Sequence, residues 1–101
     1  MTLAEMNRRY HELKGWTFRE VSGTECAFPP GRTYPESLPR LDFNANLLIP
    51  ELDLAFGKLW TCYRSPLCWR IGAEGEPPQR GETFCAAGLA ALVAKMEAKH
   101  G

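Results

Sequence analysis

The C-terminal segment 81–101, which reads GETFCAAGLAALVAKMEAKHG, constrains the fold more strongly than any other part of the chain. Its apolar residues recur at the i, i+3, i+4, i+7 and i+11 spacing that is typical of one face of an α-helix. Thr83 can cap this helix, alanine has a high helix propensity, and Gly101 ends the pattern. We therefore predict a helix that covers a sheet with an apolar face formed by Cys85, Gly88, Leu89, Leu92 and Met96, and with Ala90 and Ala94 on the opposite side.

A first amphipathic helix is predicted over residues 2–14. Thr2 and Glu5 have the spacing of a capping box, in which each residue satisfies a free backbone N–H of the other. Gly15 stands where a left-handed residue commonly ends a helix. Trp16 then follows at the position from which it can pack back on the last turn.

The segment 47–58 predicts a middle helix, because its leucines fit helical spacing. Pro50 is unfavourable inside a helix and favourable at its first position. We therefore expect the regular part to begin at Pro50, with Asn44 or Asn46 capping an irregular first turn. Asp53 is expected on a solvated face and not as a catalytic acid.

Three segments have the composition of strands, namely 16–21, 59–64 and 67–72. The last two are separated by Ser65 and Pro66 and predict an antiparallel hairpin, although proline suits the favoured two-residue turn poorly and a longer turn stays open. Together with the helices, they predict a single α+β domain over residues 1–101. Its expected architecture is a layered helix/sheet sandwich, with three helices and a three-stranded, mostly antiparallel sheet in the order α-β-α-β-β-α.

The segment 22–46 is the least regular part of the chain. It contains four prolines, which exclude a long helix or a central strand. A loop of this length in a small domain is usually functional or mobile, and its aromatic residues indicate a loop that is partly pinned to the core. Both interpretations, pinned and mobile, stay open.

Charge and hydropathy argue against several functional classes, although they leave room for a local basic patch. The 12 basic and 12 acidic residues cancel, which disfavours general nucleic-acid binding because that function requires clustered Lys and Arg. No apolar run approaches the roughly 20 residues that span a bilayer, and the N-terminal segment lacks the apolar region of a signal peptide. We therefore expect a cytoplasmic protein without a membrane partner.

The four cysteines, Cys26, Cys62, Cys68 and Cys85, lack the close pairing of zinc sites, and His11 and His100 stand near opposite termini. Reduced thiols that pack as small hydrophobic side chains are therefore expected, with no metal and no cofactor. A nucleophilic cysteine paired with a histidine has no flanking motif in its favour, and no phosphate-binding glycine signature is present. We expect a protein without enzymatic activity.

Four groups of residues carry a resemblance to a known family: Leu13–Trp16 after the first helix; Tyr34, Pro35, Asp42, Asn44 and Ala45 before the middle helix; Trp69 on a late strand; and Thr83, Ala87, Ala91 and Leu92 on the last helix. In these features the chain resembles the small phage proteins grouped as the phage ABA sandwich domain. Pro50 and the proline-rich loop depart from that pattern. The resemblance implies a phage or prophage origin and supplies no catalytic residues.

The functional expectation is a small phage accessory protein that binds a host protein, such as a component of a defence system. Self-association is compatible with the same features. The binding surface is expected on the long loop and the neighbouring hairpin, where aromatic and arginine side chains of the kind enriched at interfaces occur. The alternative is a small-ligand or nucleotide-binding protein with a pocket between the long loop and Trp69. The candidate binding residues are Arg32, Tyr34, Arg64, Trp69 and Arg70.

Overall fold

The computed structural model describes residues 2–100, apart from the side chain of His100. Within this range the chain forms, in order, α1 (Leu3–Leu13), β1 (Thr17–Val21), β2 (Thr24–Phe28), α2 (Ala45–Phe56), β3 (Trp60–Arg64), β4 (Trp69–Ala73), β5 (Gln79–Gly81) and α3 (Phe84–His100). The strands form two antiparallel sheets, β1–β2 and β3–β4–β5. The predicted α+β class with three helices is confirmed, and β2 and β5 are additional strands.

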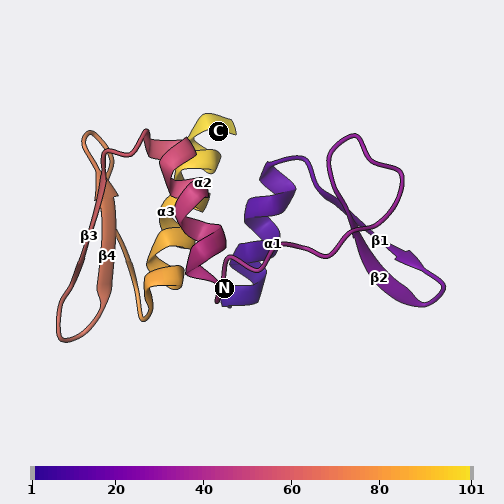
Figure 1. Cartoon of the computed structure of the whole chain (residues 1–101), viewed down its shortest axis with the longest axis horizontal. Coiled ribbons are helices and arrows are strands. Elements are labelled where there is room, and N and C mark those ends of the chain that lie inside the picture. Colours follow the sequence, from indigo (N-terminus) through magenta and orange to yellow (C-terminus); the bar gives the residue numbers. More distant parts are fainter. Residues whose placement is uncertain (1, 101) are drawn as a thin grey trace.

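The last helix, α3, lies at the centre of the fold (Figure 1). Helices α1 and α2 both pack against it, and strands β4 and β5 cover another side. The three-stranded sheet lies at one end of the molecule, and the β1–β2 hairpin extends beyond α1 at the other end (Figure 1). The molecule is therefore elongated, with extents of 45 × 26 × 24 Å.

Small residues on α3 allow its neighbours to approach closely. A Cβ atom added at Gly88 would lie 2.6 Å from Cδ2 of Leu48, so the buried Leu48 side chain would have to shift to admit a larger residue here. The predicted cap is confirmed, because the Ala86 N–H donates to Oγ1 of Thr83 at 3.1 Å. Leu92 is fully buried, as its place on the apolar face predicts, and Ala94 is exposed.

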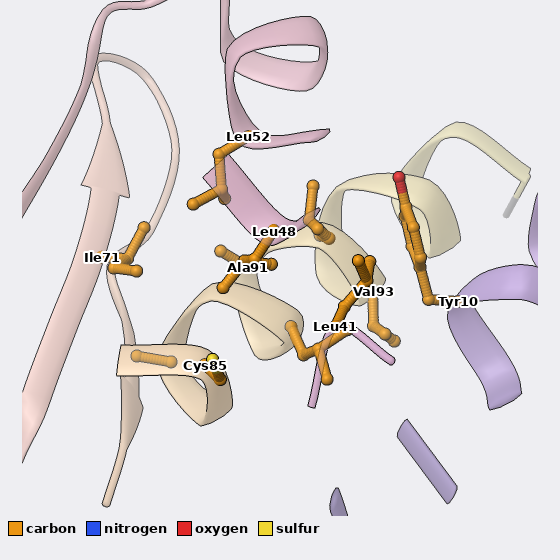
Figure 2. Packing of buried hydrophobic residues seen from close by; sticks show 11 residues of the cluster. Tyr10, Leu41, Leu48, Leu52, Ile71, Cys85, Ala91 and Val93 are labelled. Atoms are coloured by element: carbon orange, nitrogen blue, oxygen red, sulfur yellow. The ribbon is translucent and has the colours of Figure 1, made fainter. Parts of the chain in front are cut away.

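The core forms where three helices and the sheet meet (Figure 2). Leu48 and Leu52 of α2 and Ile71 of β4 are fully buried against α3. Tyr10 extends the cluster to α1, and Leu41 enters it from the long loop. Burial of apolar surface of this kind supplies most of the driving force for folding.

Both ends of α1 follow the sequence prediction. Thr2 and Glu5 form the capping box. At the other end, the Gly15 N–H donates to the Glu12 carbonyl and the Trp16 N–H donates to the His11 carbonyl, which together form a Schellman motif. The Trp16 ring packs edge-on against the His11 ring at 5.5 Å between centroids.

Helix α2 begins earlier than predicted. Its cap is Asn44, whose side chain accepts from the Asn46 N–H, and Pro50 lies inside the helix. The prediction that the regular part begins at Pro50 is wrong. Pro50 leaves the carbonyl of Asn46 without its helical partner, and Asn46 is exposed, so water can solvate that carbonyl. Burial of Leu48 against α3 stabilises the first turns despite the lost bond.

The first strand pairs within its own hairpin and not with the later strands. Ser22 and Gly23 connect β1 to β2 and both have positive φ, 53° and 82°. Two such residues form the turn whose twist matches an antiparallel hairpin. The segment 24–28, expected to be irregular, is therefore a strand, and the long loop begins at Pro29.

The long loop, residues 29–44, is pinned at two places. The Glu36 N–H donates to the Ala27 carbonyl of β2. Nearer α2, the buried side chain of Asn7 donates to the Pro39 carbonyl at 3.0 Å and accepts from the Leu41 N–H at 3.2 Å. Asn7 satisfies both backbone groups, which allows the loop to pass close to the core.

The β3–β4 connection has four residues, 65–68, so the longer of the two predicted turns is the one formed. Oγ of Ser65 accepts from the backbone N–H groups of Leu67 and Cys68 and closes this turn. Cys85 is buried, as predicted, whereas Cys62 is exposed on the edge strand β3. The expectation that the cysteines are packed in the interior is therefore wrong for Cys62.

Candidate functional site

The five residues predicted to form one binding surface lie in two separate regions. Arg32 and Tyr34 belong to the long loop, where the arginine donates to the tyrosine hydroxyl. This loop lies beside β2, and the hairpin with the other three residues lies at the opposite end of the long axis (Figure 1). The structure therefore does not bring the predicted set together.

The three predicted residues on the hairpin also divide between the two faces of the sheet. Arg64 is paired with Trp69 across the strands, and its guanidinium lies 5.7 Å from the indole centroid. Arg70 follows Trp69 in the strand and projects from the other face. Trp69 itself packs edge-on against Phe84 of α3 at 5.8 Å. The strand β4, which carries Trp69, lies at the opposite end of the molecule from the side of the long loop next to β2, so these two parts do not form the expected pocket (Figure 1).

A different concave surface lies between α1 and α2, and we call it the α1–α2 groove. It has a volume of about 380 Å³. The two helices pack against the same helix, α3, so their outward sides leave a furrow between them. The lining residues come from both helices and from the loop that passes beneath: His11, Lys14, Trp16, Pro39, Leu41, Asn46, Leu47, Pro50 and Glu51.

A polar cluster bridges the groove. Oε1 of Glu51 in α2 accepts from the Tyr10 hydroxyl at 2.7 Å and from Nζ of Lys14 at 2.6 Å. Burial alone would raise the pKa of Glu51, but these two hydrogen bonds hold the pKa below its ordinary value. Burial and the neighbouring carboxylate raise the pKa of Tyr10. Glu51 is therefore ionised and Tyr10 neutral at pH 7.

His11 is a buried, neutral side chain at the edge of the groove. Its Nδ1 lies 2.7 Å from the Asn7 carbonyl, which can only accept, so Nδ1 carries the proton. Burial lowers the pKa of His11 below its ordinary value. The other ring nitrogen, Nε2, is consequently an acceptor in the neutral ring.

Apolar side chains are exposed on α2 and just after it, and one of them, Leu47, lines the groove. Leu47 is 42% exposed, and Leu54, seven residues further along the same helix face, is 79% exposed. Leu59, just after the helix, is 72% exposed. The sequence contains a signal for this exposed surface, because the segment LLIPELDLAF has apolar residues around the whole circumference of the helix. Only part of that circumference can face α3, so some of these residues must be exposed. Helical periodicity alone does not show which ones.

No serine, threonine or cysteine is among the residues that line the groove. Cys85, the buried cysteine, has its pKa raised by burial, which favours the unreactive thiol. Over residues 2–100, leaving aside the side chain of His100, no three of the residue types His, Cys, Asp and Glu are grouped closely enough to hold a metal ion. The arrangement is suited to binding, because apolar walls surround a few fixed polar groups.

In the same described range, none of the helices combines the length and the apolar character that crossing a membrane requires. Comparison of the chain with protein-family models, with curated proteins and with solved structures returned no match.

Proposed function

We propose that this protein acts by binding another protein, and that the α1–α2 groove receives an amphipathic helix of that partner. The observation that supports this proposal is the exposure of Leu47, which lines the groove, and of Leu54, which lies two helical turns further along the same face of α2. Exposed leucines that are aligned along a groove are typical of surfaces that bind helices.

The packing of the helices favours a helical partner in particular. Both α1 and α2 rest on α3, so a further helix above the groove would cover the outward sides of both and complete a four-helix arrangement. The Glu51–Lys14 pair and the His11 side chain line the groove, and the exposed part of the ion pair can orient polar side chains of the incoming helix. The polar groups would then provide specificity, and the leucines would provide most of the affinity.

The resemblance to the phage ABA sandwich domain supports a narrower version of the proposal. It favours a phage or prophage accessory protein whose partner is a host protein in the cytoplasm, such as a component of a defence system. Absence of enzymatic activity belongs to the same proposal, because no serine, threonine or cysteine is among the residues that line the groove.

The test begins with capture of partners from a host lysate and measures the affinity of each purified partner for a set of variants. Leu54→Arg should weaken binding about 10- to 100-fold, because a leucine buried at an interface contributes roughly 1.5–3 kcal/mol. Leu67→Arg is the matched control, since Leu67 is 91% exposed on the distant β3–β4 turn and should leave the affinity unchanged. Equal affinities for Leu54→Arg, Leu47→Arg and the unmodified protein would show that the partner binds elsewhere.

A further inference from the structure

The β3–β4–β5 sheet has one face that no helix within residues 2–100 covers. In Figure 1 the helices all lie on the same side of this sheet. Ile71 of β4 is 0% exposed and points toward α3, so its sequence neighbour Arg70 points away from the helices. Tyr63 of β3 and Arg80 of β5 are the direct cross-strand partners of Arg70 and share its face. We call these three residues the Tyr63–Arg70–Arg80 row.

The two arginines of this row carry uncompensated charge. Like charges directly opposite each other on adjacent strands destabilise a sheet. Arg8, Arg9, Arg32 and Arg40 each form an ion pair with a carboxylate, whereas over residues 2–100 no ion pair includes Arg70 or Arg80. An anion between the two guanidinium groups would turn this repulsion into attraction.

Arg70 also has an unsatisfied donor. Its Nη1 donates to the Tyr63 hydroxyl at 2.7 Å, but its Nε is buried and has no hydrogen-bond partner in the described part of the chain. A buried donor without a partner is unfavourable. If the guanidinium rotates so that Nε and Nη2 both donate to an oxyanion, the Nε donor is satisfied. The resulting two parallel hydrogen bonds match the geometry of a phosphate group.

Tyr63 supplies the second part of the site. Tyr63 is 54% exposed, and the Arg70 guanidinium lies 5.7 Å from the centroid of its ring. A tyrosine ring on an open sheet face can stack with a planar base, while neighbouring arginines hold the phosphate. A ligand that has both a dianionic phosphate and a planar ring therefore uses all three residues.

We propose that the Tyr63–Arg70–Arg80 row binds a mononucleotide, with the phosphate between the two arginines and the base against Tyr63. This site lies on the sheet and is separate from the α1–α2 groove, so it does not rest on the proposed binding of a protein partner.

Calorimetric titration of the full chain with AMP and GMP tests the proposal, with adenosine and inorganic phosphate as partial ligands. Arg70→Gln and Arg80→Gln should each weaken nucleotide binding about 10-fold or more, because hydrogen bonds to charged groups are the strong ones. Tyr63→Leu should weaken nucleotide binding and leave inorganic phosphate unaffected. Arg64→Gln is the matched control, because Arg64 lies in the same sheet on the opposite face. This variant should bind the nucleotide with the affinity of the unmodified protein.

Three results would overturn the proposal: no binding of AMP or GMP at millimolar concentration, equal affinity in Arg80→Gln and the unmodified chain, or binding of a single-stranded oligonucleotide without binding of mononucleotides. Arg80 is exposed, so its substitution tests the site even where Arg70→Gln disturbs folding. Leu54→Arg should bind nucleotide normally, which separates failure of this site from failure of the groove.

Discussion

His11 shows how one residue can connect a helix end, the core and the groove. Its carbonyl accepts from Trp16 in the Schellman motif, its ring packs against Trp16, and its Nδ1–H donates to the Asn7 carbonyl. Nothing in the local sequence distinguishes a histidine in this role from one exposed on the helix surface. Around the groove it lies beside residues of the long loop and of α2, such as Pro39 and Glu51, which come much later in the chain.

The environment of His11 predicts a pH dependence of stability. Its folded-state pKa lies below the ordinary value of 6.5, so the unfolded chain binds the proton first as the pH falls. The free energy of unfolding should therefore be fully maintained above pH 6.5 and should decrease below it, by at most about 1.4 kcal/mol per pH unit from this one group.

Urea melts of the unmodified chain and of His11→Gln between pH 7 and pH 5 would measure this effect, as the variant should show a smaller decrease. The same slope in His11→Gln as in the unmodified protein would contradict the assignment of a neutral buried ring.

At the scale of elements, α3 and α2 fit together because Gly88 lies beneath Leu48. Gly→Ala inside a helix normally stabilises by roughly 1 kcal/mol through helix propensity. Here Gly88→Ala should instead destabilise the protein, because the new methyl group would overlap the Leu48 side chain.

A double-mutant cycle distinguishes this overlap from a general effect on α3. Leu48→Ala alone should lower the free energy of unfolding by roughly 2–5 kcal/mol. Adding Gly88→Ala to that variant should be neutral or stabilising, because the shortened side chain leaves room for the methyl group. Additive effects of the two substitutions in urea melts would rule out the direct contact.

At the scale of the whole molecule, stability should be uneven along the long axis. The β1–β2 hairpin extends beyond α1, whereas β4 is paired on both sides and packs against α3 (Figure 1). Segments with few contacts outside themselves open at lower free energy than segments in the core.

Hydrogen exchange monitored by NMR should therefore show faster exchange for the paired amides of β1 and β2 than for those of β4. Amides on α3 near Leu92 should be among the slowest, and they provide the internal reference. Protection of the β1–β2 amides equal to that of β4 would indicate that the molecule opens as one unit.

The features that the sequence determined by itself depend on residues close together in the chain. The capping box of Thr2 and Glu5, the helix end at Gly15, the cap at Thr83 and the burial of Leu92 follow from patterns within a few turns. Such patterns involve backbone hydrogen bonds and one helix face, so they do not require knowledge of the neighbouring elements.

Only the tertiary structure decided which elements meet. In the structure, β1 is not paired with the later strands, and α2 begins before Pro50. The part of the long loop next to β2 lies far from the hairpin that carries Arg64 and Arg70. The α1–α2 groove and the Tyr63–Arg70–Arg80 row likewise depend on packing against α3 and on strand register. Patterns of neighbouring residues could not predict these outcomes. The reason is that α3 is the last element of the sequence and yet determines which surfaces of the preceding elements are buried.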